Sequence, residues 1–341
     1  MRHRYRVREI AQQAGLSEAT VDRVLHGRPG VRASTAAEVE QAISDLDRQR
    51  AQLRIGGRTF LVDLVMQAPA RFCTAVRDAL EAELPSLRPA VIRSRFHLRE
   101  TASVAELVDT LDGIARRGSQ GVLLKAPDVP ELTDAVGRLA AAGIPVVTLV
   151  TDLPTSERVG YVGIDNRAAG ATAAYLIAQW LGDRPGTVLV TLSSESFRGE
   201  EEREMGFRAA VRRLGPRPVL EIPDSDGLDA TVGGLVRDAL ATDPDVRAVY
   251  SIGGGNLATV EAFEAAGRTC AVFIAHDLDA DNTRLLREGR VSAVLHHDLR
   301  ADLRRACQLV MRAQGALPGT LRPPPSGIQV ITPYNLPTGT W

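Results

Sequence analysis

The chain has 341 residues, of which 44% are hydrophobic and 24% charged, so the composition excludes a disordered or fibrous protein and the length predicts two or three compact units. Residues 1–58 hold 11 Arg and no Lys against 7 acidic residues, which puts this segment at +4 and the remainder at −5. A basic terminal module on an acidic body favours a polyanion as partner, although a solvated basic face has the same surplus.

Several further classes of protein are excluded by what the chain lacks. Cys73, Cys270 and Cys307 are widely spaced and form no CxxC pair, so neither a disulfide framework nor a zinc site is predicted. No apolar run approaches the roughly 18 residues of a membrane span. The basic N-terminus is not followed by the apolar stretch of a secretory signal. We therefore expect a cytoplasmic protein.

Two short amphipathic helices are predicted at the start of the chain, over Val7–Ala14 and Glu18–Leu25. Gly15 ends the first, and Ser17 is suited to cap the second. Val21, Val24 and Leu25 would face inward, which leaves Ala19, Thr20, Asp22 and Arg23 outward. Two helices joined by a glycine-containing turn predict a helix-turn-helix, whose second helix fits the major groove of DNA.

A third helix is predicted from about Thr35 to Arg48, capped by Ser34 or Thr35. The stretch VREIAQQAGLSEATVDRVLHGRPGVRASTAAEVEQAISDL resembles the DNA-binding headpiece of the LacI family, because the AxxAGxS turn, the TVxRVLxG helix and the VRxxTxxxVxxAxxxL helix occur in that order. The resemblance implies base contacts by some residues and phosphate contacts by others. The expected DNA-binding residues are Ser17, Glu18, Ala19, Thr20, Arg23, Arg32, Thr35 and Leu53.

Within this set, the resemblance assigns base edges to Glu18, Ala19 and Arg23, and an arginine there can bond O6 and N7 of guanine. Asp22 stands where a small polar residue is common. It would either accept from a cytosine amino group or pair with Arg23. The Tyr and the Pro-Asn of the family's Tyr-x-Pro-Asn turn are missing from residues 46–54, which leaves open whether a hinge helix forms. Leu53 is either a minor-groove wedge or part of an extended third helix.

From Thr59 onward, apolar segments of strand length alternate with amphipathic helices. This pattern predicts parallel sheets wrapped by helices, with binding at the carboxyl ends of the strands in a cleft between two lobes. The predicted strands are Phe60–Met66, Val91–Phe96, Gly121–Lys125, Val146–Leu149, Tyr161–Ile164, Thr187–Leu192, Arg217–Ile222, Ala248–Ile252, Val272–Ala275 and Ala293–His296. The predicted helices include Phe72–Glu83, Val104–Arg117, Pro130–Ala142, Arg167–Leu181, Glu200–Leu214 and Leu257–Ala266.

This second region is similar to the periplasmic sugar-binding-protein fold that serves as the effector domain of the LacI family. The similarity rests on GVLLKAPDVPELTDAVGRLAAAGIPVVTLVTDLP, YVGIDNRAAGATAAYLIAQWLG, REMGFRAAV and AVFIAHDLD, which occur in the expected order. The expected domains are therefore an all-α headpiece over 1–48, a hinge or linker over 49–58, and a two-lobed α/β ligand-binding domain over 59–341.

A sugar site needs carboxylates and arginines that bond vicinal hydroxyls, together with an aromatic face for the ring. Matching positions to the family gives Arg71, Phe72, Asp152, Arg203, Asn256, Asp277 and His297 as ligand-binding residues, with Gln67, Phe197 and Arg198 as weaker candidates. Asp165 and Asn166 are expected to cap a helix instead.

Two positions depart from the family pattern. Gly253–Gly255 occupies a place where related binders put Asn or Asp, which either opens the pocket or hands the contact to Asn256. His297 stands in place of a usual Gln and would either sense pH or donate a single hydrogen bond.

Catalysis is not expected. Gly253-Gly254-Gly255-Asn256 does not satisfy GxGxxG, and Lys125 is the only lysine in the chain and lies outside any GK[ST] motif. GxSxG and HExxH are also absent, and neither cofactor nor metal is expected. A transport-type sugar-binding protein is the alternative that shares the two-lobed domain, but the helix-turn-helix and the missing signal favour a regulator.

We therefore expect a transcription regulator of the repressor type whose homodimer reads a near-palindromic operator. Its effector would be a sugar, a polyol or a sugar acid, and this ligand would either release the operator or promote its binding. The dimer contact is expected along one edge of the paired lobes. A dimer is favoured over a tetramer because the C-terminal segment shows no leucine heptad.

Overall fold

The protein is described by a computed structural model that covers residues 4–55, 59–88, 90–322 and 324–337, except for the side chains of residues 45 and 47–55. The chain forms two compact units. The first contains residues 1–59 together with the short stretch 88–91, and the second contains residues 60–87 and 92–341. No helix in the described ranges is both long and apolar enough to cross a membrane.

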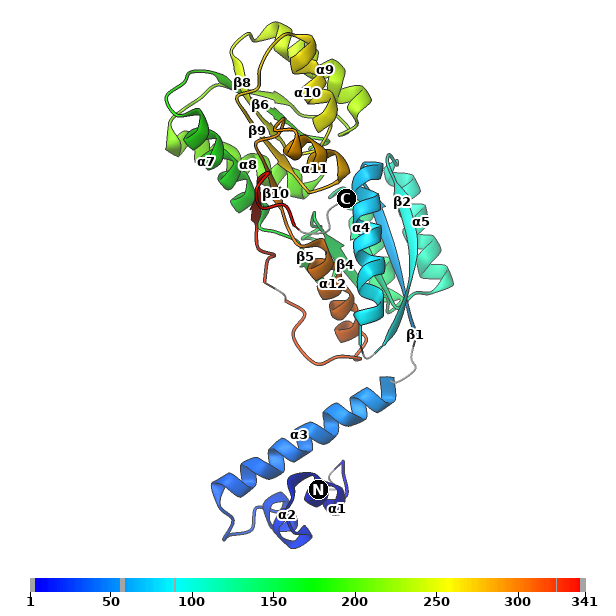
Figure 1. Ribbon diagram of the computed structural model, residues 1–341. Coiled ribbons are helices and arrows are strands. Elements are labelled where there is room, and N and C mark those ends of the chain that lie inside the picture. The colour runs from blue at the N-terminus through cyan, green and yellow to red at the C-terminus, as the bar shows by residue number, and fades with distance from the viewer. Residues whose placement is uncertain (1–3, 56–58, 89, 323, 338–341) are drawn as a thin grey trace. The chain divides into compact units, whose positions relative to one another are not determined.

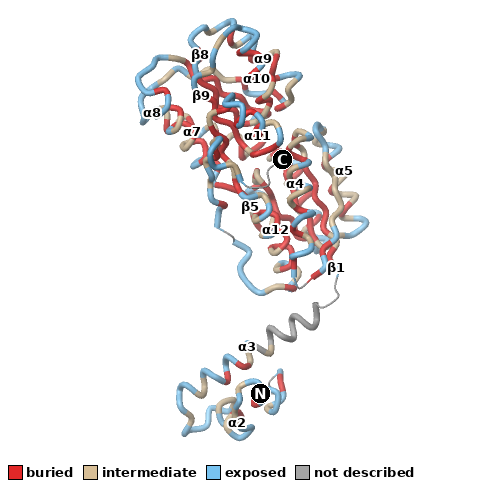
Figure 2. The backbone as a smooth tube through the Cα atoms, viewed as in Figure 1, coloured by how far each residue is buried: buried red, intermediate tan, exposed pale blue. Residues whose placement is uncertain are grey.

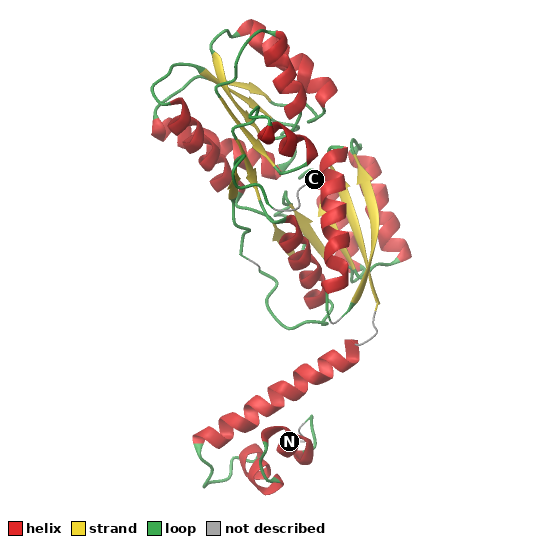
Figure 3. Ribbon diagram, viewed as in Figure 1, coloured by secondary structure: helices red, strands yellow, loops and turns green. Residues whose placement is uncertain are grey.

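The first unit contains helices α1 (Val7–Ala14), α2 (Glu18–Leu25) and α3 (Ala33–Ile55); Figure 3 shows it as helix and loop without strands. Its small core is built from residues of all three helices together with Tyr5. Gly15, at φ 65°, ends α1 and lets the chain turn toward α2. The buried residues are Tyr5, Ile10, Ala11, Val21, Val39 and Ala42. These positions confirm the predicted helix-turn-helix.

The third helix departs from its expected bounds at both ends. It begins at Ala33, so Ser34 and Thr35 lie inside the helix instead of capping it. It continues to Ile55, past the expected end at Arg48, so the helix extends through most of the expected linker. Without the helix-breaking Pro of the family turn, nothing in residues 46–54 interrupts the helical pattern. The side chain of Leu53 lies outside the described residues.

The second unit has two lobes, each with its own sheet (Figure 1). The first-lobe sheet has the order β2-β1-β3-β4-β5, and the pairs β1/β3, β3/β4 and β4/β5 are parallel. Helices α5 and α6 pack together on one side, whereas α4 and α12 pack against each other. The elements are β1 Thr59–Gln67, α4 Ala70–Glu83, the 3-10 turn Leu84–Ser86, β2 Val91–Arg99, α5 Val104–Arg117, β3 Gly121–Lys125, α6 Pro130–Ala141, β4 Val146–Leu149, β5 Gly160–Val162 and α12 Leu299–Ala313.

The second-lobe sheet has the order β11-β10-β9-β8-β6-β7. It is parallel except for β11, which runs antiparallel to β10. Helices α7 and α8 cover one side of the sheet and α9, α10 and α11 contribute to the core on the other. The elements are α7 Asn166–Leu181, β6 Thr187–Thr191, α8 Arg198–Leu214, β7 Val219–Ile222, α9 Asp229–Thr242, β8 Val246–Ser251, α10 Asn256–Ala265, β9 Val272–His276, α11 Ala280–Arg287, β10 Ala293–His296 and β11 Gln329–Ile331.

The chain passes between the lobes three times: after β5, after β10, and between α12 and β11. Two of these passages touch each other where Ile164 forms an isolated bridge with Ser326. Helix α12 therefore belongs to the first lobe although it follows the second-lobe strands in sequence. A connection of this kind confines lobe motion to a few hinge residues.

All ten predicted strands are present, and the two-lobed α/β fold is confirmed. The structure adds β11, which pairs with the edge strand β10 through three residues. A strand of three residues is too short to show the alternation of apolar and polar residues by which a strand is predicted. The inner strands form the buried centre of each lobe, whereas the edge strands β2, β7 and β11 are mostly half-buried or exposed (Figure 2).

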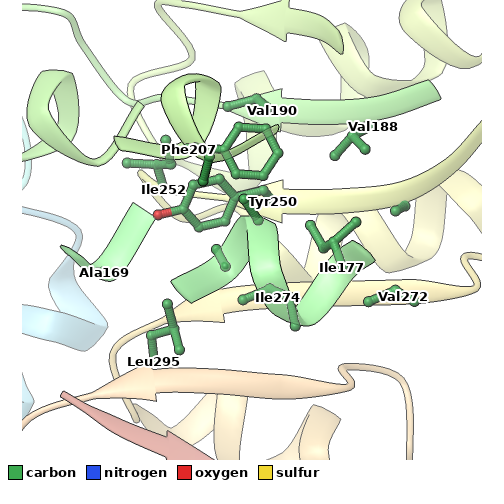
Figure 4. Packing of buried hydrophobic residues seen from close by; sticks show 14 of the residues in the cluster. Ala169, Ile177, Val188, Val190, Phe207, Tyr250, Ile252, Val272, Ile274 and Leu295 are labelled. Atoms are coloured by element: carbon green, nitrogen blue, oxygen red, sulfur yellow. The ribbon is translucent and has the colours of Figure 1, made fainter. Parts of the chain in front are cut away.

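In the second lobe, the core also determines where functional side chains point. The rings of Phe207 and Tyr250 stack with centroids 4.9 Å apart (Figure 4). Helices α7 and α8 approach closely because Gly170 and Gly206 stand at their contact; a Cβ at Gly170 would overlap the carbonyl of Arg203. This close contact presses the start of α8, and with it Arg203, against Asn166 on α7.

Candidate functional site

A cavity lies between the two lobes, and the space inside it is about 750 Å³ when the part open to solvent is counted. Its wall follows the carboxyl ends of β1, β3 and β4 in the first lobe and of β6, β8 and β9 in the second. The polar and aromatic residues of the wall are Gln67, Arg71, Phe72, Glu100, Lys125, Thr151, Ser193, Phe197, Glu200, Arg203, Asp226, Asn256, His276, Asp277, Asp279 and Asn282.

Four buried polar atoms of this wall have no hydrogen-bond partner within the described protein: Gln67 Oε1, Asn256 Oδ1, His276 Nδ1 and Asp277 Oδ1. A buried polar atom that stays unpaired costs about 1–3 kcal/mol, so such atoms at a cavity wall mark places where a ligand can bond. Three of the four are oxygens, which can only accept. The wall therefore offers acceptors to a ligand that carries donors.

The second lobe holds these atoms in place through a buried network. Asn256 Nδ2 donates to Asn282 Oδ1 at 2.7 Å, and Asn282 Nδ2 donates to the carbonyls of His276 and Asp277 at 2.9 and 2.6 Å. His276 Nε2 lies 2.8 Å from the hydroxyl of Tyr250. Burial lowers the pKa of His276 well below its usual value, aided by Arg203, so this imidazole is neutral.

Asp277 forms an ion pair with a histidine that lies behind the cavity wall. His297 is buried, with Nε2 at 3.5 Å from Asp277 Oδ1 and Nδ1 at 2.5 Å from Asp302 Oδ2. Burial alone would lower the pKa of His297, but the two carboxylates outweigh it and raise that pKa to about 9. Burial would raise the pKa of Asp277, and His297 with Arg203 instead hold it well below its usual range. Asp277 is therefore ionised beside a protonated imidazole.

The three cations of the wall are already engaged by the protein. Arg203 donates to Asn166 Oδ1 at 2.9 Å and to the Ile252 carbonyl at 3.4 Å. Lys125 donates to the Gln67 carbonyl at 2.9 Å and lies 4.1 Å above the ring of Phe197. Burial lowers the pKa of Lys125, against the opposing effect of Glu200.

The third cation, Arg71, pairs with Asp279 at 2.9 Å between Nε and Oδ2. Burial raises the pKa of Asp279 to about 6, even though the Asn282 amide and Arg71 both lower it. Enclosure of this carboxyl therefore outweighs the attraction of its arginine partner. The pair is part of the wall and joins one lobe to the other.

Three non-glycine residues of the wall have left-handed backbones: Val150 at φ 64°, Asp226 at φ 52° and Asp277 at φ 62°. This conformation is costly for L-residues and most costly for a β-branched one such as Val150. Among the described non-glycine residues, the strained backbones thus all lie at the cavity. Strain of this kind persists only where the surrounding structure holds the residue in place, as it does in many binding sites.

The structure places most of the expected ligand-binding residues in this wall. Five of the seven line the cavity, together with two of the weaker candidates: Arg71, Phe72, Arg203, Asn256, Asp277, Gln67 and Phe197. The rest lie elsewhere. Asp152 and Arg198 line a separate hollow of about 660 Å³, counting the part open to solvent, and His297 is enclosed behind Asp277.

Asp152 has a physical reason to lie outside the cavity. Its carboxylate already accepts from Thr148 Oγ1 at 2.6 Å and from the Leu153 amide at 2.8 Å, and it forms a two-pronged pair with Arg158. A carboxylate with its lone pairs used in this way has little left for a ligand. Asp165 accepts from the Ala168 amide and caps α7, as expected.

Sequence reasoning missed several wall residues: Glu100, Lys125, Ser193, Glu200, Asp226, His276, Asp279 and Asn282. Lys125 and His276 are the last residues of β3 and β9. Their position at the carboxyl ends of parallel strands could have predicted that they line the cavity. In the sequence, Asp279 and Asn282 look like residues of a helix start. Asp279 does cap α11 through Oδ1, but its second oxygen, Oδ2, faces Arg71.

The described residues contain no cluster of three or more His, Cys, Asp or Glu that could hold a metal ion. The three cysteines are free thiols.

A second candidate surface lies on the headpiece. Glu18, Ala19, Arg23 and Arg32 are exposed, and Thr20 and Thr35 are half-buried. Ser17 Oγ accepts from the Thr20 amide at 3.2 Å, which confirms its capping role. Arg23 forms no side-chain hydrogen bond or ion pair with another described residue, so its guanidinium is available to a partner.

Asp22 does not pair with Arg23. Its carboxylate lies 3.1 Å from His26 Nδ1 and 3.3 Å from Arg28 Nη1. This arrangement overturns the expected Asp22–Arg23 alternative and holds an acidic group beside two basic ones at the end of α2.

Comparison with known proteins agrees with this architecture. Residues 64–316 match the family described as periplasmic binding protein domain, and residues 6–49 match the bacterial regulatory proteins of the lacI family. The ribose import binding protein RbsB of Escherichia coli is 25% identical over 56% of this chain, and the chain spans 64% of that protein. The HTH-type transcriptional regulator reg1 of Streptomyces lividans is 26% identical over 81% of this chain and 73% of that protein.

Solved structures share the fold of the two-lobed part. A glucose-galactose binding protein from Geobacillus stearothermophilus superposes with a TM-score of 0.73 at 22% identity, over 82% of this chain and 99% of that one. A putative LacI transcriptional regulator from Bacteroides fragilis gives 0.71 at 18% identity, over 82% and 98%. The chain therefore belongs to the family of periplasmic binding protein domains, joined here to a helix-turn-helix domain of the bacterial lacI regulatory family.

Proposed function

We propose that the protein is a transcription regulator that binds an operator through its headpiece and a small hydroxyl-rich molecule through the interlobe cavity. The observation that carries this proposal is the presence, in one chain, of an exposed arginine-bearing helix α2 and a cavity lined by unpaired acceptors. Arg23 would read a base pair, and Arg32 and Thr35 would contact phosphates. The protein would act as a homodimer and repressor in the cytoplasm.

The ligand we propose is uncharged. Five carboxylates in the cavity wall stand against three cations: Glu100, Glu200, Asp226, Asp277 and Asp279 against Arg71, Lys125 and Arg203. Each cation already has a protein partner, whereas Asp277 Oδ1 accepts no hydrogen bond within the described protein and lies 3.5 Å from His297 Nε2. A sugar acid would bring a further negative charge to a wall with no free cation. A neutral sugar or polyol offers only donors and acceptors and suits this wall better.

In the proposed complex, ligand hydroxyls donate to Asp277, Asn256 and Gln67. A bond to the ionised Asp277 would be the strongest of these, because a charged acceptor roughly doubles the strength of a hydrogen bond. Phe72 offers an apolar face to the ring. Binding would bias the arrangement of the lobes and thereby change operator affinity by about 1–3 kcal/mol, and operator binding would change ligand affinity by the same amount.

A matched thermal-shift screen tests the ligand class. Each neutral sugar is paired with its acid: D-glucose with D-glucuronate, D-galactose with D-galacturonate, and ribitol with ribonate. A ligand at 100 times its dissociation constant stabilises the domain by about 2.7 kcal/mol, a shift of several degrees. We expect shifts from one or more neutral members and none from their acids. Shifts from the acids alone would contradict the proposed charge selection.

An operator assay tests the switch. A binding site is first selected from random duplex DNA, and its affinity is then measured with and without the stabilising sugar. We expect affinities that differ by about 5- to 150-fold. Equal affinities would exclude the proposed coupling even if both ligands bind.

A transport role is the alternative that the similarity to the ribose import binding protein favours. A binding protein of an importer has no use for a helix-turn-helix that leaves an arginine unpaired, so we propose regulation and not transport. We also propose that the protein is not an enzyme and uses no cofactor. Recovery of the protein from a periplasmic fraction with its headpiece removed would favour transport.

A further inference from the structure

Arg71 reaches across the cavity from one lobe into the other. The residue lies in the first turn of α4, in the first lobe. Its Nε lies 2.9 Å from Oδ2 of Asp279, and its Nη2 donates to the carbonyl of Gly227 at 3.2 Å. Both partners belong to the second lobe. The guanidinium thus makes two directional contacts to the opposite lobe, as a bound ligand would.

The second lobe forms a receptor that fits this guanidinium. Asp279 uses its two oxygens separately: Oδ1 accepts from the Asn282 amide at 2.8 Å and caps α11, so the helix start holds Oδ2 toward Arg71. The Asp279 side chain is 5% exposed and the Arg71 side chain 19%, so the pair is largely shielded from water. Shielding strengthens attraction between charges and favours one geometry for a planar guanidinium.

The glycine loop after β8 gives this receptor its space. A Cβ at Gly254 would overlap Nη2 of Arg71, and Gly254 has φ +113°, a backbone conformation that other residues rarely adopt. The space that a side chain would fill at this position is taken by an arginine from the facing lobe.

We propose that Arg71 is an interlobe latch: its guanidinium binds a second-lobe receptor formed by the Asp279 carboxylate, the Gly227 carbonyl and the side-chain-free Gly254, and holds the cleft closed before a ligand enters. The receptor is selective for a guanidinium. One N–H group must point to the Asp279 carboxylate and another to the Gly227 carbonyl, and a planar guanidinium carries donors in both directions. This inference goes beyond the proposed function, since it concerns the ligand-free protein and is independent of the effector's identity.

Other contacts between the lobes are compatible with closure but lack this selectivity. The Gly199 amide donates to Thr151 Oγ1 at 2.9 Å, and the Asp128 amide donates to the Ser196 carbonyl at 2.8 Å. Lys125 lies over Phe197. None of these contacts involves Arg71 or Asp279, so removal of the latch tests one contribution to closure and takes away no atom of the others.

The experiment measures the distance between the lobes in the full-length, ligand-free chain by pulsed electron paramagnetic resonance. Spin labels are attached at Asp109→Cys in the first lobe and Asp238→Cys in the second, both at exposed positions, in a Cys270→Ser background. We expect one short distance for the otherwise unchanged protein. Asp279→Asn, which keeps a side-chain oxygen to cap α11, should shift at least half of the molecules to longer distances.

A matched control removes the same charge from a pair that lies within one lobe. Arg138 and Asp112 join α6 and α5 of the first lobe at 2.8 Å, so Asp112→Asn should leave the distance distribution unchanged. If Asp279→Asn and Asp112→Asn give the same distribution as the parent protein, or if the parent protein is already open, the latch is ruled out.

Chemical rescue separates the latch from a general loss of stability. Arg71→Ala should open the cleft, and guanidinium chloride at low millimolar concentration should restore the short distance by filling the vacated receptor. The same salt should have no effect on the Arg71→Ala/Asp279→Asn double variant, and sodium chloride should not rescue Arg71→Ala. Failure of guanidinium to rescue Arg71→Ala, with the receptor intact and the protein folded by circular dichroism, would overturn the proposed selectivity.

Discussion

The headpiece and the interlobe cavity use their polar residues in opposite ways. The headpiece carries its candidate DNA-contacting residues on an exposed surface, and most of them come from one stretch between Ser17 and Arg23. The cavity collects residues from positions as far apart as Gln67 and Asn282, and several of their polar atoms are buried. In the first region most of the site is the surface of one helix, whereas in the second the site exists only where two lobes meet.

This difference teaches how each site should respond to damage. The headpiece core contains only six buried hydrophobic residues among those described, so the helix surface depends on very few contacts. The cavity rests on large cores on both sides of each sheet, and its weak points are instead the buried charges in its wall. We therefore expect apolar substitutions to disable the first site and charge substitutions to disable the second.

The largest effect is expected from Ile10→Ala in the headpiece. Ile10 is fully buried, and truncation of such a residue costs about 2–5 kcal/mol, which a core of this size cannot replace. Operator binding should be lost, whereas the melting of the second unit and its response to sugar should not change. Calorimetry and a DNA-binding assay check this. Gln12→Ala, at an exposed position of the same helix, should have no effect, and a parallel loss of sugar response in Ile10→Ala would break the comparison.

The next largest effect is expected from His297→Gln behind the cavity. Removing one partner of a buried charge cluster leaves Asp277 and Asp302 facing each other, at a cost of about 3 kcal/mol. Because the pKa of His297 is raised from 6.5 to about 9 on folding, its contribution is complete below about pH 6.5 and is lost as the pH rises through about 9.

The stability of the second unit should therefore fall between pH 7 and pH 10 in the parent protein and change less in His297→Gln, as measured by calorimetry. His26→Gln, at an exposed headpiece position, serves as the control and should leave this pH profile unchanged. Identical profiles for the parent protein and His297→Gln would show that His297 carries no charge in the folded protein.

A smaller effect is expected from Asp277→Asn on ligand affinity. The change removes a charged acceptor and should weaken binding of the sugar identified by the screen by about 2–3 kcal/mol, roughly 30- to 160-fold. Titration calorimetry measures this. Operator affinity without sugar should remain within twofold of the parent protein, and Asp112→Asn should bind both as the parent does. An unchanged sugar affinity would remove Asp277 from the proposed site.

The smallest effect is expected from Arg23→Ala on operator affinity. Loss of one base-reading arginine should cost about 1–3 kcal/mol and relax the preference at one base pair. Arg32→Ala should instead weaken binding to all sequences alike, because a phosphate contact carries no sequence information. Competition binding with single-base variants of the selected site distinguishes the two. Arg212→Ala, exposed on α8, controls for the lost charge and should leave operator affinity unchanged.

Much of the fold could be predicted because it depends on local patterns. The ten strands, the first two helices and the capping by Ser17 and Asp165 follow from runs of apolar residues and from residues that bond their own backbone. The sequence left two alternatives for residues 49–55, a separate hinge or an extension of α3, and the structure shows the extension to Ile55. Helix propensity alone does not show where a helix without a stop signal ends. Strand β11 was too short to carry a pattern.

By itself, then, the sequence determined which segments form helices and strands, that parallel sheets would place a site at their carboxyl ends, and which residues the headpiece exposes. Only the tertiary structure decided which charges meet. It turned Asp152 toward Arg158, enclosed His297 between Asp277 and Asp302, and placed Arg71 against Asp279. The physical reason is that secondary structure depends on neighbours a few residues away, whereas the pairing of buried charges depends on which distant segments share a desolvated space.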